Sequence, residues 1–306
     1  MTRMKQVPEP QSITDLDALL PAPGKDGYTF FENAASHPFE KTLDFRHVNA
    51  CWLIDVSYLT YAADAQYAVD QLRNGGLEGA PFGFDRAGPP HILVAHNTDV
   101  IIVAFRGTRI QDLPDILADI SFVPALTGNG LVHSGFQSAL SAGGVWDNAA
   151  RYVAGIAGNQ AIWFTGHSLG AALATLAFRN YRDGSGRRQA LYTFGSPRVG
   201  DQLIYCGGYP GNSYRIVNQQ DAVPHVPTPP LYGHVGLPFG ADGKPLAGSS
   251  WEDLEHGFSE IGSVLAVFSR ATREIRLRDY FAQLAIKPLG DHAPKSYAAA
   301  LWNSLT

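Results

Sequence analysis

Apolar and polar positions alternate along the chain in a pattern that predicts successive helices and strands. Residues 49–73 contain neither glycine nor proline, and their apolar residues recur at helical spacing, which predicts one amphipathic helix. Two runs rich in β-forming residues, 91–95 and 100–105, are separated by the polar turn 97–99. This arrangement predicts a hairpin that enters a central sheet.

Beyond residue 105, predicted helices and strands continue to alternate. The predicted helices are 137–154, 171–181 and 296–305, and the predicted strands are 161–165, 190–194 and 214–217. Such alternation is typical of an α/β fold with a mostly parallel central sheet flanked by helices. No linker interrupts residues 46–306, so we expect a single domain there. Residues 1–45 are rich in proline and lack sustained periodicity, and we interpret them as an N-terminal arm.

Composition excludes several classes of protein. The chain has 306 residues, of which 45% are hydrophobic and 17% are charged, as in an ordinary globular protein. Its 23 basic and 28 acidic residues give a net charge of -5, so we expect no nucleic-acid partner. Because Cys51 and Cys206 lie far apart, we expect two free thiols and neither a disulfide framework nor a zinc cluster.

The chain also lacks the usual signals for membrane insertion or export. Its longest apolar runs are far shorter than the ~20 residues of a membrane-spanning helix, so we expect no transmembrane segment. Residues 1–20 lack the apolar stretch of a signal peptide. We therefore expect a protein that is cytoplasmic or is exported without a conventional leader.

A serine stands where a strand is predicted to turn into a helix. The sequence Gly166-His167-Ser168-Leu169-Gly170 follows an apolar strand and precedes an alanine-rich helix. This is the pattern of a nucleophile elbow, in which glycines let neighbouring backbone approach a strained turn. Because a serine hydroxyl is a weak nucleophile near neutral pH, a base and an orienting acid must lie nearby.

The chain offers two candidates for the acid. In hydrolases with a nucleophile elbow, the acid and then the histidine follow the serine along the chain. Asp221 follows the strand 214–217 directly and is the preferred acid. Asp201 is the rival, although a solvated turn explains its position better.

Four histidines follow Ser168 and compete for the role of base. His225 lies only four residues from Asp221, and His256 lies on what reads as a solvated helix end. His234 falls in a predicted strand, 232–236, where a packed structural histidine is the better interpretation. His292 precedes the terminal helix in a loop and is the preferred base, with His234 second.

Six motifs in order resemble the class 3 lipase family, the filamentous-fungal triacylglycerol lipase type of α/β hydrolase. The resemblance covers about residues 49–305. The motifs are Phe105-Arg106-Gly107-Thr108, Val132-His133-Ser134-Gly135-Phe136, the elbow 166–170, Phe194-Gly195-Ser196-Pro197-Arg198-Val199-Gly200, Asp221-Ala222-Val223-Pro224, and Asp291-His292 with Tyr297.

The resemblance implies a role for each matching residue. Ser168 is expected to attack an ester carbonyl, His292 to accept and return the proton, and Asp221 to orient the imidazole. Backbone N–H groups of Thr108 and Leu169 are expected to form the oxyanion hole. The expected reaction passes through an acyl-enzyme and requires no metal and no organic cofactor.

The implied substrate is an acylglycerol, most readily a triacylglycerol, met at a lipid–water interface. Two alternatives within the same chemistry are a phospholipase A1 and a short-chain or aromatic esterase. A rival of another class is a catalytically silent lipid-binding module. The fold and the triad do not distinguish between the candidate ester substrates, because the walls of the pocket determine substrate specificity.

Two segments have open interpretations. Residues 109–124 place several apolar side chains on one helical face. The family resemblance implies that this segment is a lid, and the alternative is a fixed helix packed in the core. These candidate lid residues are Ile110, Leu113, Ile116, Leu117 and Ile120. The segment 246–285 is longer than in compact family members and is interpreted as a cap, a partner surface or additional packing.

The lid hypothesis predicts the kinetics of hydrolysis at the solubility limit of the substrate. If an apolar lid turns towards lipid, turnover should rise abruptly once the ester exceeds its solubility. Initial rates measured across that limit test this expectation. A smooth saturation curve without a jump would contradict a moving lid.

Overall fold

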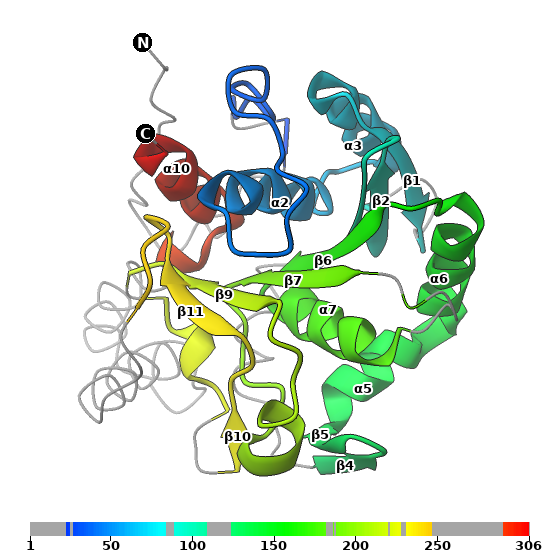
Figure 1. Cartoon of the computed structure of the whole chain (residues 1–306), viewed down its shortest axis with the longest axis vertical. Helices are drawn as coiled ribbons and strands as arrows, with labels where there is room; N and C mark the ends of the chain where they lie inside the picture. Colours follow the sequence, from blue (N-terminus) through cyan, green and yellow to red (C-terminus); the bar gives the residue numbers. More distant parts are fainter. Residues whose placement is uncertain are drawn as a thin grey trace, which may run out of the picture.

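The computed structural model describes residues 23–24, 27–83, 89–108, 124–181, 186, 188–219, 221–227, 231–246 and 290–305. Within this part of the chain, seven strands form one sheet in the order β1-β2-β3-β6-β7-β9-β11 (Figure 1). They are β1 Glu78–Phe82, β2 Ile92–His96, β3 Val100–Phe105, β6 Ala161–His167, β7 Gln189–Phe194, β9 Ser213–Val217 and β11 Leu237–Gly240.

The five strands β3, β6, β7, β9 and β11 are parallel to one another, which confirms the mostly parallel central sheet. The two antiparallel pairs of this sheet are β1 with β2 and β2 with β3. Every residue of β3 and β6 is buried, as is typical of strands covered on both faces. The predicted hairpin is also confirmed, because β2 pairs with β3 through a turn in which Asn97 Oδ1 accepts the N–H groups of Asp99 and Val100.

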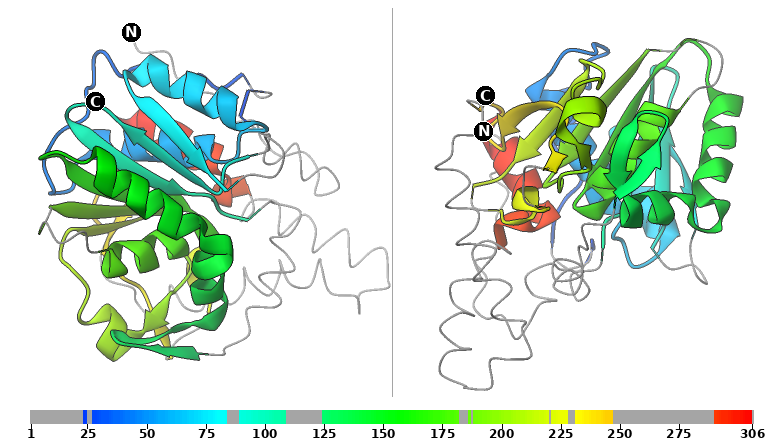
Figure 2. Two further views of the ribbon diagram at one scale, coloured as in Figure 1. Left: turned by 90° about the vertical axis from the view of Figure 1, so that its right-hand side faces the viewer. Right: turned by 90° about the horizontal axis from the view of Figure 1, so that it is seen from below.

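Helices cover the two faces of the sheet (Figures 1 and 2). Helices α2 His47–Leu59 and α10 Pro294–Ser304 pack together on one face. The opposite face carries α7 Leu169–Asn180, with α5 Ser134–Ser141 and α6 Val145–Ile156 beside it. The predicted helices 171–181 and 296–305 are thus confirmed and begin about two residues earlier, the second with a proline in its first turn.

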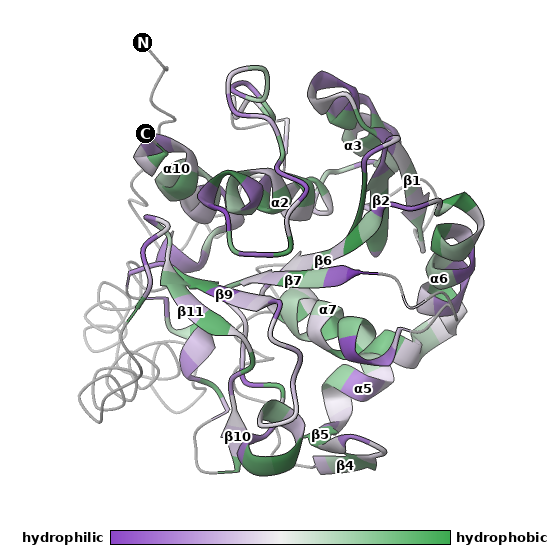
Figure 3. Cartoon of the chain, in the orientation of Figure 1, coloured by the Kyte–Doolittle hydropathy of each residue, from purple (hydrophilic) through white to green (hydrophobic). Residues whose placement is uncertain are grey.

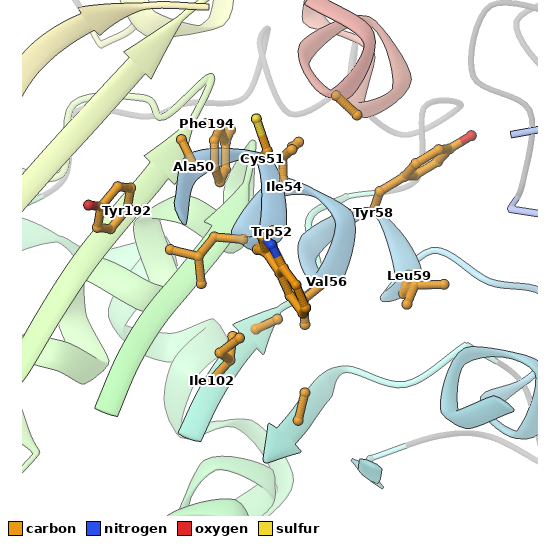
Figure 4. Packing of buried hydrophobic residues seen from close by; sticks show 14 of the residues in the cluster. Ala50, Cys51, Trp52, Ile54, Val56, Tyr58, Leu59, Ile102, Tyr192 and Phe194 are labelled. Atoms are coloured by element: carbon orange, nitrogen blue, oxygen red, sulfur yellow. The ribbon is translucent and has the colours of Figure 1, made fainter. Parts of the chain in front are cut away.

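The prediction of one amphipathic helix over 49–73 is wrong. The segment forms α2 and a separate helix, α3 Ala65–Leu72. The side chain of Asp64 caps α3 by accepting the N–H of Tyr67 at 2.8 Å, which starts a new helix. Every residue of α2 except His47 is buried, so this helix has no solvated face. Figure 4 shows its side chains packed beside Ile102 of β3 and Phe194 of β7.

Helix α2 is covered on its outer side by residues that precede it. Tyr28, Phe30 and Phe31 are buried in the same core. The Tyr28 hydroxyl donates to the buried carboxylate of Asp55 at 2.6 Å, and the N–H of Phe31 donates to it at 2.8 Å. The boundary between an arm and a domain at residue 46 stays a prediction.

The prediction of one helix over 137–154 is also wrong. Helices α5 and α6 are separated by a short 3-10 turn, Ala142–Gly144. Gly143 and Gly144 have φ angles of 61° and 62°, a left-handed conformation that ends one helix and redirects the chain. The apolar spacing of the segment does not reveal this break.

A smaller sheet lies beside the central one, with strand order β10-β8-β5-β4. Its strands are β4 Pro124–Thr127, β5 Gly130–His133, β8 Gly200–Asp201 and β10 Tyr232–Gly233. The predicted strand 232–236 is therefore limited to its first two residues. A π-helix, Gln202–Cys206, follows β8 and exposes 86% of Leu203 and 65% of Ile204, the strongly hydrophobic segment beside β10 in Figure 3.

The two remaining described elements are the 3-10 helices Arg73–Gly75 and Val223–His225. Cys51 and Cys206 are both free thiols, as predicted. Among the described residues, no helix combines the length and apolar character needed to span a membrane.

Candidate active site

Ser168 lies in a strained turn between β6 and α7. Its φ of 59° and ψ of -131° are rare for a residue other than glycine. A side chain on Gly166 would collide with the carbonyl group of Gly170, and one on Gly170 would collide with the carbonyl oxygen of Phe105. The two glycines therefore allow the start of α7 to press against the end of β3.

A buried histidine and a buried aspartate meet beside this turn. His292 Nδ1 lies 2.9 and 3.0 Å from the two carboxylate oxygens of Asp221, and the residues are 1% and 0% exposed. Because a carboxylate accepts hydrogen bonds, Nδ1 carries the hydrogen, and Nε2 of the neutral ring has a lone pair. Within the described part of the chain, Nε2 of His292 is buried without a hydrogen-bond partner.

The end of β7 connects the serine with this pair. The N–H of Ser168 donates to the carbonyl oxygen of Phe194 at 3.0 Å. A Cβ atom on the next residue, Gly195, would lie 2.7 Å from Oδ2 of Asp221 and 3.0 Å from the ring of His292. The structure thus brings Ser168, Asp221 and His292 to the carboxyl ends of neighbouring parallel strands, where sites in such sheets assemble.

Thr108 and Leu169 flank the serine. A Cβ atom on Gly107, which follows β3, would lie 3.1 Å from Cβ of Ser168, so Thr108 is close to the turn. Its hydroxyl is buried and has no partner among the described residues. Leu169 begins α7, where N–H groups have no acceptor within the helix and the helix dipole favours negative charge.

Tyr297 completes the surroundings of Asp221. Its hydroxyl donates to Oδ2 at 2.6 Å and accepts the N–H of Asn218 at 3.1 Å, while the N–H of Val223 donates to Oδ1 at 2.9 Å. Burial, followed by the charge of Asp221, holds the pKa of Tyr297 well above its usual range. The phenol therefore stays protonated and serves as a donor to the carboxylate.

The rival residues lie elsewhere. Nε2 of His234 is 2.7 Å from the carbonyl oxygen of Pro224, and burial, with the charges of Arg215 and Arg198, holds the pKa of His234 well below its usual range. Asp201 accepts the N–H groups of Leu131 and Ile204 from the smaller sheet and its π-helix.

The carbonyl group of His225 faces a buried arginine. It accepts from Nη1 of Arg198, which also donates to the carbonyl oxygen of Pro227 at 2.9 Å. Burial and the nearby Arg215 lower the pKa of Arg198 to about 10. These bonds engage the backbone carbonyl of His225 and hold the loop that carries Asp221.

Several predicted residues lie outside the described residues. They are His256, the segment 247–289, and the candidate lid residues Ile110, Leu113, Ile116, Leu117 and Ile120. Whether 109–124 moves as a lid, and which role 246–285 has, stay predictions.

Two residues beside the serine, the partly buried Tyr61 and the buried His167, were not singled out by the sequence. The hydroxyl of Tyr61, just beyond α2, lies 2.9 Å from Nδ1 of His167. His167 occupies the variable position before Ser168 in the glycine-rich pentapeptide. The presence of a histidine there was the only sequence signal that could have indicated a role at the site. No sequence pattern connects it with Tyr61, which is 106 residues away.

A cavity of about 250 Å³ adjoins Thr108 and Leu169. Its described walls include Phe105, Leu140 and Trp146 from β3, α5 and α6, with Arg106 contributing polar character. The space beside Thr108 and Leu169 is thus mainly apolar with a few polar groups, as is typical of small-molecule sites.

Comparison with known proteins gives a consistent family. Residues 102–230 match the family described as Lipase (class 3). The secreted mono- and diacylglycerol lipase A of Penicillium cyclopium is 33% identical over 151 residues, 47% of this chain and 47% of that protein. The lipase of Rhizomucor miehei is 35% identical over 157 residues, 44% of this chain and 40% of that protein. The chain thus spans less than half the length of these curated relatives.

Solved structures show the same fold. One is described as a triacylglycerol lipase whose catalytic centre is a serine protease triad, with a TM-score of 0.50 and 24% identity over 63% of this chain and 79% of that chain. A mutant MDLA protein of Penicillium cyclopium has a TM-score of 0.50 and 24% identity over 67% of this chain and 82% of that chain. At this identity the likeness is one of fold.

Because Tyr297 donates to a carboxylate, we expect its Tyr→Phe variant to lose more free energy of unfolding than a Tyr→Phe variant at a bond to a neutral acceptor. Tyr297→Phe should lower the free energy of unfolding by about 1–3 kcal/mol, because it leaves a buried N–H of Asn218 and an oxygen of Asp221 short of a partner. Tyr214→Phe is the matched control, since Tyr214 donates to the neutral carbonyl oxygen of Leu43 at 2.9 Å. Urea unfolding compares them, and an equal loss in both variants would contradict the argument.

Burial of neutral histidines predicts a loss of stability on acidification. Burial lowers the folded-state pKa of His167 and of His234 well below 6.5. As the pH falls through 6.5, both histidines bind protons in the unfolded chain but remain neutral in the folded chain. Each histidine should therefore remove up to about 1.4 kcal/mol of unfolding free energy between about pH 7.5 and about pH 5.5.

The variant His234→Gln, which retains a donor for the carbonyl of Pro224, isolates one of these contributions. Urea unfolding of both proteins at the two pH values should show a smaller loss in the variant. An unchanged loss would show that His234 is not a source of the acid sensitivity.

Proposed function

We propose, on the premise that residues 102–230 match the class 3 lipase family of α/β hydrolases, that this chain is a serine carboxylic-ester hydrolase acting on acylglycerols. One observation carries the proposal. Nε2 of His292 is buried and unpartnered among the described residues, while Nδ1 of the same ring is held by Asp221. This is the state in which a histidine beside the Ser168 turn can accept a proton.

In the proposed acylation, Oγ of Ser168 forms a bond to the carbonyl carbon of the ester. Its proton passes to Nε2 of His292, and the carbonyl electron pair moves onto the oxygen. The N–H groups of Thr108 and Leu169 donate to that oxyanion, and each such donor contributes about 3–4 kcal/mol by mutational precedent. The intermediate then expels the alcohol, which takes the proton from His292, and an acyl ester of Ser168 remains.

Deacylation repeats these steps with water. A water molecule attacks the acyl carbon and gives a proton to His292, and the collapse of the intermediate releases the carboxylic acid and returns the proton to Ser168. Asp221 stabilises the imidazolium in both halves and keeps the ring in the required tautomer. The bonds from Tyr297 and Val223 keep this carboxylate fixed.

The proposed substrate class rests on the cavity and on the relatives. The largely apolar cavity beside Thr108 and Leu169 suits the hydrocarbon part of an ester. The relatives are named as lipases of mono- and diacylglycerols or as a lipase without further detail. The Penicillium and Fusarium proteins are also named as secreted, which favours the exported alternative for this chain.

The proposal predicts that Ser168→Ala abolishes ester hydrolysis while the protein remains folded. Removing one triad member typically costs about 10⁴-fold or more in turnover. His292→Ala should lose hydrolysis similarly, whereas His234→Ala should mainly lose stability, since His234 binds Pro224 and not Asp221. Initial rates with a chromogenic ester, together with far-ultraviolet circular dichroism, test all three variants.

Undiminished hydrolysis by Ser168→Ala would refute the assignment of the nucleophile. To identify the substrate, the wild-type protein should be assayed for its rate of hydrolysis of emulsified mono-, di- and triacylglycerols, a phospholipid and short-chain esters. Preference for an acylglycerol supports the proposed substrate, and preference for the phospholipid or the soluble esters would favour the alternative enzymes. Lipid binding without hydrolysis of any ester would favour the silent module.

A further inference from the structure

A chain of hydrogen bonds, buried at His167 and partly buried at Tyr61, runs behind the proposed nucleophile. The hydroxyl of Tyr61 lies 2.9 Å from Nδ1 of His167 and 3.4 Å from the carbonyl oxygen of the same residue. Nε2 of His167 lies 2.6 Å from the carbonyl oxygen of His292. The end of α2 is thereby connected to the elbow and onward to the loop of the proposed base.

The direction of these bonds follows from the acceptors. A carbonyl oxygen only accepts, so Nε2 of His167 must carry the hydrogen. Burial, and next the proximity of His292, holds the pKa of His167 well below its usual range, so the ring is neutral. Nδ1 then has a lone pair, and the Tyr61 hydroxyl must donate to it. One tautomer satisfies both nitrogens.

Tyr61 also reaches the strand end that carries Thr108. Its hydroxyl lies against Gly107, where a side chain would collide with it. Burial raises the pKa of Tyr61, while the charge of Arg106 and a hydrogen bond with the N–H of Gly107 lower it. A single hydroxyl group therefore contacts both the oxyanion loop and the residue before Ser168.

The ring of His167 also packs against the proposed base. The ring centroids of His167 and His292 are 4.5 Å apart with an interplanar angle of 36°. The ring of Tyr297 meets His167 edge-on at 5.8 Å. His167 thus supports both the backbone and the ring of His292.

We propose that Tyr61 and His167 are positioning residues that hold three loops at fixed separation: the loop of Thr108, the elbow of Ser168 and the loop of His292. This inference rests on the proposed function, because it concerns the geometry of that site. Acyl transfer requires the serine, the base and the oxyanion donors to act together on one carbonyl group. A misplacement of about 1 Å can cost about 100-fold in rate, which is why a rigid connection behind the site matters.

The chain offers a closely matched control. Ser57 Oγ and Thr165 Oγ1 form a buried hydrogen bond of 3.0 Å between α2 and β6, the elements that also lead to Tyr61 and His167. The variant Thr165→Val removes this bond without touching the three loops. It therefore measures the effect of losing a buried bond between the same two elements.

The experiment compares Tyr61→Phe, His167→Leu, His167→Gln and Thr165→Val with the wild-type protein. We expect Tyr61→Phe and His167→Leu to lower kcat about 10- to 100-fold with KM within about twofold, since positioning acts on the transition state. His167→Gln retains a donor towards the carbonyl of His292 and should recover part of the loss. Thr165→Val should keep kcat within about twofold.

Urea unfolding and the rate of Ser168 modification by a phosphonate ester accompany the kinetics. The phosphonate rate, normalised to the folded fraction, should fall in parallel with kcat in Tyr61→Phe and His167→Leu. Losses no larger than that of Thr165→Val, or a rise in KM alone, would overturn the positioning role. If the wild-type protein hydrolyses no ester, the proposed function fails by itself, and that outcome is distinct from a wild-type enzyme whose variants stay active.

Discussion

The tight turn at Ser168 is the constraint on which the rest of the site depends. With φ at 59° and glycines two residues before and after it, the turn brings the start of α7 against the carbonyl group of Phe105 at the end of β3. Its N–H group is bonded to Phe194 at the end of β7. Three adjacent strand ends are therefore fixed relative to one residue. The segment after β3 carries Thr108. Gly195, directly after β7, lies against Asp221, which follows β9, and against His292, which precedes α10.

Electrostatics impose the second constraint, because Asp221 is a fully buried carboxylate. Such a group is tolerated only where donors replace its lost hydration. His292, Tyr297 and Val223 supply these donors, and Tyr297 in turn accepts from Asn218. The loop around Asp221 is braced separately by Arg198 and by His234, whose ring is bound to Pro224. Neighbouring donors thus hold the Asp221 carboxylate in place, and the carboxylate in turn orients the His292 ring.

Sequence patterns predicted the parts of this structure that local rules determine. Continuous apolar runs predicted the buried strands, and the pentapeptide around Ser168 predicted the strand-to-helix turn. The breaks within 49–73 and 137–154 were missed, because a single cap at Asp64 and two left-handed glycines outweigh apolar spacing. The pairing of Asp221 with His292 depended on family order, since no local pattern measures a contact across 71 residues. The network of Tyr61 and His167 is equally long-range, and the lid residues lie outside the described part of the chain.

The central claim is that the turn presents Ser168 as a nucleophile to His292. The most direct measurement is covalent labelling by an activated phosphonate ester, with the modified residue located by peptide mass spectrometry. The account predicts one adduct, on Ser168, and a strongly reduced labelling rate in His292→Ala. An adduct on another serine, or labelling of Ser168 at the wild-type rate without His292, would contradict it.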